Sequence, residues 1–279
     1  MRVIKSDLIS ETVENLCAQA NYDLPEDVLD SLKMSFNTAE KIPKEILGEI
    51  IENANIAKKE RIPLCQDTGV ANFFVNFGKN VSIEDGNIYD AINKGVASGY
   101  LNNYLRKSMV TDPFERVNSQ DNTPANIYIE IVDGKNIEIS FLPKGGGCEN
   151  ASAIEMFNPS SDWEDVKNFI LSVVEKKGWN ACPPLVIGIG IGTDFSSVGF
   201  LAKKSLIRTI GSHNQNQLYD NREKELLRCV NELNIGVMGF GGKDTALAVF
   251  IEPKPCHIAS LPVAVNIQCH SYRRKTIVI

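Results

Sequence analysis

Hydrophobic residues recur with the period of an α-helix over the first sixty positions of the chain. One stripe is formed by Ile9, Val13, Leu16 and Ala20, and a second by Ile46, Leu47, Ile50, Ile51 and Ala54. Pro25 and Pro43 stand where helices would begin, which suits a residue without an N–H donor. The pattern predicts three helices, and a helical N-terminal subdomain over about residues 1–60 is expected.

The pattern then changes to that of β-strands. Residues 70–77, VANFFVNF, are aromatic and β-branched and predict a strand, which a helix over residues 89–105 follows. Residues 126–142 alternate on either side of Asp133-Gly134, a dipeptide typical of two-residue hairpin turns. We therefore expect a hairpin whose two strands pair directly with each other.

The second half of the chain alternates helical patterns with short apolar runs. Helices are predicted over residues 162–177, 195–210 and 217–233, and strands over residues 183–192, 245–251 and 261–267. No internal repeat or low-complexity segment occurs. The predicted fold class is mixed α/β, with a helical N-terminal region followed by mixed β-sheet elements with flanking helices, in a single domain over residues 1–279.

Charge and hydropathy exclude several classes of protein. The chain has 29 Lys and Arg residues against 35 Asp and Glu residues, a net charge of −6. Such a balance disfavours a general attraction to nucleic acid or to an anionic membrane surface. No apolar run approaches the roughly 18 residues of a membrane span, and no signal-peptide core follows the N-terminus. We expect a cytoplasmic protein that binds neither nucleic acid nor membrane.

The seven cysteines are an odd number scattered over the chain, and no CxxC pair occurs, which disfavours a disulfide framework and a zinc ribbon. Taken singly, each is expected to be a small buried hydrophobe, as Cys17 and Cys229 are at apolar helical positions. The alternative is that the fold gathers a few thiolates. Cys65, Cys182 and Cys269 would then hold an iron–sulfur cluster with one iron open to substrate, a Lewis acid suited to removing water from a hydroxyacid.

Two glycine-rich turns fall short of nucleotide-binding motifs. Gly188, Gly190 and Gly192 lack the third glycine of the dinucleotide fingerprint, because position 193 is Thr. The turn from Gly236 to Lys243 is one residue too long for a phosphate loop, and Asp244 follows it. These glycines predict close backbone approach or positive φ angles instead.

Seven ordered motifs carry a resemblance to a known family. They are PLCQDTG (63–69), LRKS (105–108), DNTPA (121–125), KGGGCEN (144–150), ACPP (181–184) with GIGIG and AKKSLIR (202–208), MGFGGKDTA (238–246) and HIASLPVAVNIQCH (257–270). Together they resemble iron–sulfur hydro-lyases of the class I fumarase and L-tartrate dehydratase type, over residues 4–274. The chain is similar to the alpha subunit of the two-subunit form, or to the N-terminal domain of the single-chain form.

The resemblance implies a set of site residues. Cys65, Cys182 and Cys269 would ligate a [4Fe-4S] cluster. Gln66 and Asp67 would lie against the substrate, Arg106 would pair with a substrate carboxylate, and the backbone near Gly146 and Gly147 would approach it. Asp67 and His257 are the implied catalytic residues.

The resemblance also implies a reaction and partners. The expected activity is reversible hydration of fumarate to L-malate, or dehydration of L-tartrate to oxaloacetate, on a small dicarboxylate substrate. A separate beta subunit would complete the active site and supply the general base, and an alpha–alpha homodimer would form the core of the assembly. The motifs leave fumarate and tartrate undecided.

One departure from the family pattern and two rival functions leave alternatives open. Position 148 is Cys where much of the family has Ser, so Cys148 is a harmless replacement, a fourth thiol near the cluster or a redox-sensitive position. A non-catalytic regulatory protein that binds a cluster and dicarboxylates, or a zinc hydrolase with Cys and His ligands, would account for some of the same residues.

Several basic and polar residues outside the implied site have two interpretations. Lys203, Lys204 and Arg208 are expected to form a solvated basic face. Arg273 and Arg274 are candidates for the surface on which a partner docks, and residues 118–124 for a loop near the site or at an interface.

Overall fold

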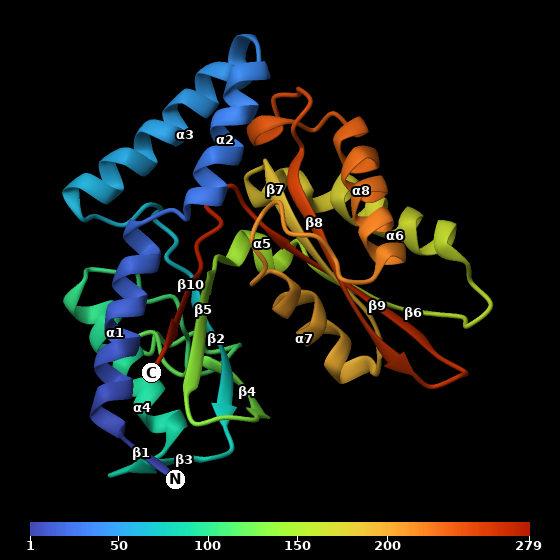
Figure 1. Cartoon of the computed structure of the whole chain (residues 1–279). Coiled ribbons are helices and arrows are strands. Elements are labelled where there is room, and N and C mark those ends of the chain that lie inside the picture. The colour runs from blue at the N-terminus through green and yellow to red at the C-terminus, as the bar shows by residue number, and fades with distance from the viewer. The chain divides into compact units, whose positions relative to one another are not determined.

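The computed structural model describes residues 1–279 (Figure 1). Its helices are α1 (Ser6–Tyr22), α2 (Glu26–Thr38), α3 (Lys41–Glu60), α4 (Ile88–Asn102), α5 (Gly146–Asn150), α6 (Trp163–Lys177), α7 (Phe195–Ser205) and α8 (Gln217–Glu232), with 3-10 turns η1 (Gly178–Ala181) and η2 (Val237–Gly239). Its strands are β1 (Arg2–Lys5), β2 (Val70–Gly78), β3 (Val81–Glu84), β4 (Asn126–Val132), β5 (Ile137–Lys144), β6 (Ala153–Phe157), β7 (Leu185–Thr193), β8 (Ala246–Cys256), β9 (Leu261–Gln268) and β10 (Lys275–Val278). The mixed α/β prediction is confirmed. No helix is long and apolar enough to cross a membrane.

The chain divides into two compact units. Unit 1 comprises Met1–Pro25, Asn53–Gly146 and Arg273–Ile279, and unit 2 comprises Glu26–Glu52 and Gly147–Tyr272. The three predicted N-terminal helices are present, and the division between the units falls within the third of them, α3. One domain over residues 1–279, with a helical subdomain at about 1–60, stays a prediction.

Unit 1 is built on a four-stranded sheet in the order β10-β5-β2-β4. Helices α1 and α4 pack against each other, and their apolar faces share one hydrophobic core with β2 and β5. The predicted α1 stripe lies in that core, because Ile9, Val13, Leu16 and Ala20 are all buried. The hydrophobic period of this helix therefore predicts which of its faces is buried.

The predicted hairpin around Asp133-Gly134 is wrong, although both of its strands exist. Strand β2 lies between β4 and β5: it pairs in parallel with β4 and antiparallel with β5. The side chains of Phe73 and Phe141, opposite each other on β2 and β5, stack in the core with ring centroids 4.9 Å apart. Burying the aromatic strand β2 between two neighbours satisfies its backbone on both edges, which outweighs the local turn signal.

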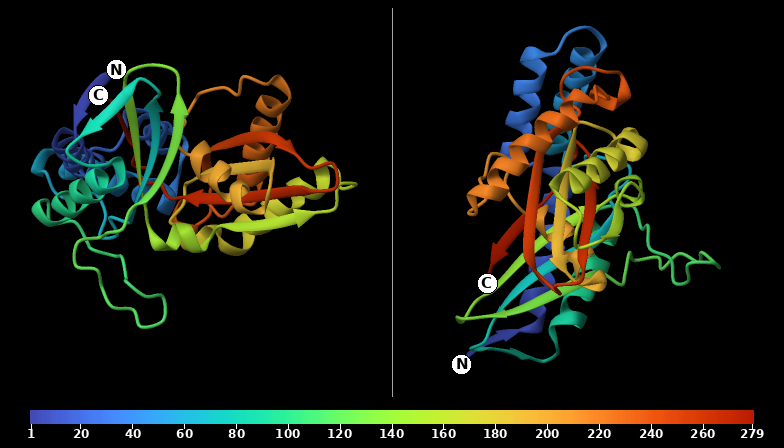
Figure 2. Two further views of the ribbon diagram at one scale, coloured as in Figure 1. Left: turned by 90° about the horizontal axis from the view of Figure 1, so that it is seen from below. Right: turned by 90° about the vertical axis from the view of Figure 1, so that its right-hand side faces the viewer.

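Unit 2 is built on a second four-stranded sheet, in the order β6-β9-β7-β8. Helices α6 and α8 cover one face, where their apolar residues share a core with β7, β8 and β9. Helix α7 covers the other face, where Val198 and Ala202 pack against Ala264 of β9. The right-hand view of Figure 2 shows the strands of this sheet layered between helices.

The isoleucines and glycines of the sequence IGIGIG in β7 lie on opposite faces of the sheet. Ile187 and Ile189 point into the core shared with α6 and α8. Gly188 and Gly190 point to α7, and a Cβ atom on either would overlap backbone atoms of Ala202 and Val198, respectively. The prediction that these glycines mark a close backbone approach is confirmed, and the approach is that of a helix rather than of a nucleotide.

Gly190→Ala is expected to destabilise unit 2 by about 1–3 kcal/mol, because the methyl group would overpack against the α7 backbone. Urea denaturation measures the change in the free energy of unfolding. Gly199→Ala on α7 is the matched control: its Cβ would lie 3.4 Å from Ile154, and alanine favours a helix, so it should be neutral or stabilising. Wild-type stability of Gly190→Ala would contradict this account of the packing.

Candidate active site

The loop 63–69 of unit 1 presents three of the predicted site residues. Cys65 and Asp67 are half-buried and Gln66 is exposed. The carboxylate of Asp67 accepts a hydrogen bond from the N–H of Gly69 at 3.0 Å and another from the N–H of Gly146 at 2.9 Å. Two backbone donors therefore fix the Asp67 side chain and bring the predicted Gly146 directly beside it.

Buried hydrogen bonds hold the backbone of this loop in place. The hydroxyl of the fully buried Tyr100 donates to the carbonyls of Thr68 and Gly69, at 3.1 and 3.0 Å. Burial is the main cause that raises the pKa of Tyr100 well above its usual value of 10, so the hydroxyl stays protonated and remains a donor.

Arg106 is attached to the same loop through its main chain. The hydroxyl of Thr68 donates to the Arg106 carbonyl at 3.1 Å. The Arg106 side chain is exposed and forms no hydrogen bond or ion pair within the chain, so its guanidinium is available to an anionic ligand.

Asn122 ties the two segments together, and the motif DNTPA carries it. Its side-chain Nδ2 donates to the Gly69 carbonyl at 3.1 Å, while its Oδ1 accepts from the N–H groups of Ser108 and Met109 at 2.7 and 3.2 Å. The residue is fully buried and has a φ of 65°, which asparagine tolerates better than most residues. The prediction of a loop near the site identified the motif but not this bridging role.

Arg273 corrects an expectation. It is only 1% exposed, so it is not part of a docking surface. Its guanidinium donates to Oδ1 of Asn21 at 2.8 Å and to the main-chain carbonyl of Asp67 at 2.9 Å. The segment that carries Arg273 therefore supports the Asp67 loop. No signal in the sequence predicts this contact, because a charged residue near a chain end is usually solvated.

Unit 2 places two of the predicted ligands, Cys182 and Cys269, on neighbouring segments. Cys182 is exposed, follows η1 and has a φ of 53°. Its carbonyl accepts from the backbone N–H of His270 at 3.2 Å and lies 3.0 Å from His270 Nδ1. Cys269, half-buried and next to His270, follows the end of β9. His270 therefore connects the two segments that carry the predicted ligands. The sequence analysis assigned no role to His270.

The KGGGCEN and AKKS motifs meet on unit 2. Lys203 is buried and its Nζ lies 2.7 Å from Oε1 of Glu149, and Arg208 pairs with Glu223. The expected solvated basic face is therefore wrong for these two residues. The thiol of Cys148 is buried with its Sγ 3.8 Å from the Ala181 carbonyl, a weak contact that suits the role of a harmless replacement for a hydroxyl donor.

His257 lies at the opposite end of the unit 2 sheet from Cys182. It is exposed in the turn between β8 and β9, and Cys256, the last residue of β8, pairs with Thr193, the last residue of β7. Cys182 precedes the first residue of β7, so the full length of the strand separates it from His257. The structure does not bring His257 beside the cysteines of its own unit.

The donor set fits an iron–sulfur cluster in its chemistry. No cysteine forms a disulfide, and Cys65, Cys182 and Cys269 are all at least partly exposed, unlike the buried Cys17. Cys229 is half-buried rather than core. Within either unit, no three Cys, His, Asp or Glu side chains are gathered closely enough to hold a metal ion.

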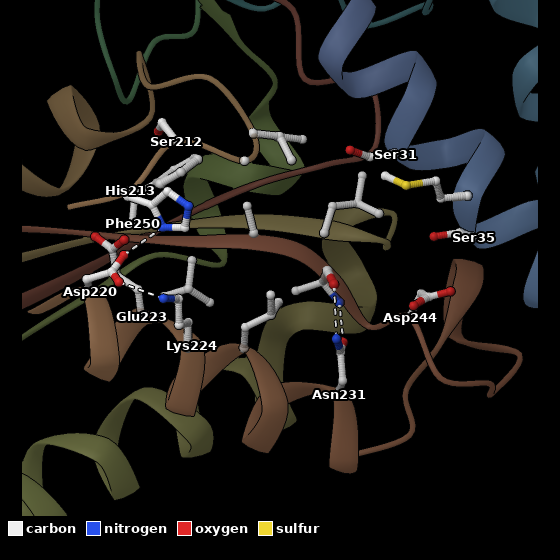
Figure 3. A pocket seen from close by; sticks show the side chains of 18 of the residues that line it. Ser31, Ser35, Ser212, His213, Asp220, Glu223, Lys224, Asn231, Asp244 and Phe250 are labelled. Atoms are coloured by element: carbon white, nitrogen blue, oxygen red, sulfur yellow. Dashed lines mark hydrogen bonds and ion pairs between the residues drawn. The ribbon is translucent and has the colours of Figure 1, made fainter.

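A cavity of about 460 Å³ lies elsewhere in unit 2, between α2, α8 and the edge strand β8 (Figure 3). None of the predicted site residues lines it. At one end, Asp220 lies 3.0 Å from Nδ1 of the exposed His213 and 2.7 Å from Nζ of Lys224. The hydrogen bond from Lys224, with that of His213, lowers the pKa of Asp220 from 3.8 to about 2.

Comparison with known proteins covers nearly the whole chain. A family model described as fumarate hydratase (Fumerase) matches residues 10–278. A protein of Methanocaldococcus jannaschii named "Putative L(+)-tartrate dehydratase subunit alpha" is 44% identical over 273 residues, 95% of each chain. The L(+)-tartrate dehydratase subunit alpha of Escherichia coli K12 is 30% identical over 276 residues, 97% of this chain and 90% of that protein. These similarities confirm the resemblance that the motifs predict.

Asn122→Gly is expected to lower the free energy of unfolding by about 2–3 kcal/mol, because the N–H groups of Ser108 and Met109 lose their acceptor and the buried Gly69 carbonyl keeps only the Tyr100 hydroxyl. Glycine accepts the positive φ, so the loss reports the amide rather than backbone strain. Gln120→Gly is the matched control, since Gln120 has a φ of 71° in the same loop and an exposed side chain. Urea denaturation measures the change in the free energy of unfolding. An equal decrease for the two variants would show that the hydrogen bonds of Asn122 do not stabilise the loop.

Asp220→Asn is expected to be less stable than the wild type at pH 6, with a gap that closes as the pH falls from about 4 towards 2. The folded-state pKa is the lower one, so the stabilisation is complete above 3.8 and disappears through about 2. Thermal unfolding across this pH range measures the gap. A gap of constant size would mean that the Lys224 and His213 contacts do not stabilise the carboxylate.

Proposed function

The chain belongs to the fumarate hydratase family, and we propose that it is the alpha subunit of a hydro-lyase that acts on a small dicarboxylate. The reaction is the reversible hydration of fumarate to L-malate, or the dehydration of L-tartrate to oxaloacetate. The names of the relatives support the second substrate and the description of the family model supports the first.

One observation carries the proposal: an exposed, unpaired guanidinium and a fixed carboxylate are anchored to one loop. Arg106 and Asp67 are connected through Thr68, whose hydroxyl bonds the Arg106 carbonyl. Arg106 presents a bidentate fork that suits a substrate carboxylate. Asp67, with each carboxylate oxygen already accepting one N–H, keeps lone pairs to orient a substrate hydroxyl or relay its proton.

We assign the cofactor to the thiolates of Cys65, Cys182 and Cys269. When bound, a [4Fe-4S] cluster with an open iron supplies a Lewis acid that makes the substrate hydroxyl a better leaving group. The positive φ of Cys182 and its bridge to His270 are local features that would hold two of the thiolates in place. Gln66, Gly146 and Gly147 supply exposed polar and backbone groups for the substrate.

The partner in this proposal is a separate beta subunit. The relatives are named alpha subunits, and this chain covers 90–95% of their length. The beta subunit would complete the substrate pocket and supply the general base that removes the proton on the carbon next to the hydroxyl. A single exposed guanidinium is otherwise little positive charge for a dianion near a protein of net charge −6.

Anaerobic reconstitution tests the cofactor assignment. Cys65→Ala, Cys182→Ala and Cys269→Ala are each expected to lose most of the bound iron and sulfide, because each removes one of three ligands. Cys256→Ala is the matched control, an exposed cysteine outside the proposed ligand set, and should keep both. Measurement of iron, sulfide and the visible spectrum decides, and a fully loaded Cys269→Ala protein would contradict the assignment.

Turnover tests the function. The alpha chain with its beta partner should form malate from fumarate or oxaloacetate from tartrate, and the alpha chain alone should have little or no activity. Arg106→Ala should cost about 10–100-fold in kcat/KM, the effect of losing a charge-assisted pair. Full activity of the isolated alpha chain would refute the proposed partner. A loaded complex that binds both substrates but turns over neither would favour a regulatory role.

A further inference from the structure

We infer that the cavity between α2, α8 and β8 binds a short peptide with free ends, which adds to β8 as a strand. The cavity belongs wholly to unit 2, and its volume of about 460 Å³ lies in the range of small-ligand sites. No residue of the proposed active site lines it, so the inference does not rest on the hydro-lyase function. It rests on an open strand edge, a buried hydroxyl without a partner and two separated charges.

Strand β8 is the edge strand of its sheet and pairs only with β7. At the beginning of β8, the Asn231 amide accepts the N–H of Ala246 at 2.8 Å and donates to its carbonyl at 3.2 Å. Near the other end, Glu223 accepts the N–H of Ile251 at 2.7 Å, and Asn214 donates to the Ile251 carbonyl at 2.8 Å. Side chains therefore take the place of a neighbouring strand at these two positions.

The main chain between these two positions has no such substitute. Ile251 directs its N–H and C=O away from β7, and residues two apart in a strand direct these groups to the same side, so Val249 does too. Val249 lines the cavity, and no side chain bonds its main chain. The stretch from Ala246 to Ile251 spans at most about 16 Å, at about 3.3 Å per residue. The occupied ends exclude a long added strand, such as β8 of a second copy, and leave room for about two or three residues.

Helix α2 forms the opposite wall with small hydroxyl side chains. Ser31 and Ser35, one turn apart, both line the cavity (Figure 3). The Ser31 hydroxyl donates to the Asp27 carbonyl at 2.7 Å, whereas the hydroxyl of Ser35, a residue only 6% exposed, has no partner within the chain. A buried hydroxyl without a partner costs free energy, so we expect a polar group of a ligand beside it. Leu227 of α8 and Ala248 of β8 add apolar surface for small side chains.

Charged groups at the two ends of the cavity set the direction of the peptide (Figure 3). Asp244 is half-buried, lies at the same end as Ser35, and forms no hydrogen bond or ion pair within the chain. The peptide ammonium would pair with Asp244 and donate to Ser35. At the opposite end, Lys224 uses one of its three N–H donors on Asp220, at 2.7 Å, which leaves two for the peptide carboxylate. Because Asp244 precedes β8, the peptide would run parallel to that strand.

Isothermal titration of the full chain with trialanine tests the inference. We expect saturable binding at one site with a Kd below about 1 mM, which suits a ligand of this size. N-acetyl-trialanine should bind at least tenfold more weakly, because it lacks the ammonium group that pairs with Asp244. Trialanine amide should bind about two- to fivefold more weakly, because Lys224 is exposed to solvent. Hexylammonium has the charge but no peptide group and should bind at least tenfold more weakly than trialanine.

Variants locate the site. Asp244→Asn should weaken trialanine binding at least tenfold and leave the binding of N-acetyl-trialanine unchanged. Lys224→Gln should remove the preference for trialanine over its amide. Asp30→Asn is the matched control, because Asp30 is an exposed carboxylate on α2 that does not line the cavity, and it should bind trialanine as the wild type does. Thermal unfolding of each variant verifies that it is folded.

Several outcomes would overturn the inference. One is the absence of saturable trialanine binding up to about 10 mM. Others are equal affinity for trialanine and its N-acetyl form, equal affinity for hexylammonium, and wild-type affinity in a folded Asp244→Asn variant. The comparison of peptides uses the wild-type chain, so it decides even if a variant fails to fold. Binding is measured without dicarboxylate, and failure of the proposed hydro-lyase function would leave these results unaffected.

Discussion

The alternation of glycine and isoleucine along β7 constrains the rest of unit 2. Because Gly188 and Gly190 have no Cβ, the backbone of α7 lies directly on the strand, while the isoleucines of the opposite face fill the core under α6 and α8. The strand lies between two packed layers and pairs with β8 on one edge and β9 on the other. Its two ends are therefore fixed points: Cys182 lies before the beginning of the strand, and His257 follows Cys256, which pairs with its last residue.

Unit 1 has a constraint of a different kind, made of buried polar groups. Tyr100, Asn122 and Arg273 are almost fully buried, and their donors go to backbone carbonyls of the loop that carries Cys65 and Asp67. A buried backbone carbonyl that loses its donor costs free energy, so the loop has little freedom to rearrange. The exposed groups Gln66 and Arg106 are consequently presented from a rigid base.

Much of the secondary structure could be predicted because hydrophobic period reports burial. The α1 stripe and the buried strand β7 both follow their patterns. The separation of β4 from β5 could not be predicted, because the Asp133-Gly134 signal is local whereas the insertion of β2 between them is a long-range choice. Helix α7 ends at Ser205, earlier than expected, where the chain turns to place Arg208 on Glu223.

The sequence by itself determined the family and the mixed α/β class and indicated the residues proposed to bear the chemistry, because seven motifs in order are specific whatever their arrangement in space. Only the tertiary structure decided what supports them and where they lie. Arg273 is buried and donates to the Asp67 carbonyl, and Lys203 pairs with Glu149. His257 lies at the opposite end of the unit 2 sheet from Cys182. Burial, strand register and distance depend on contacts between segments far apart in the chain, and motif spacing carries no record of them.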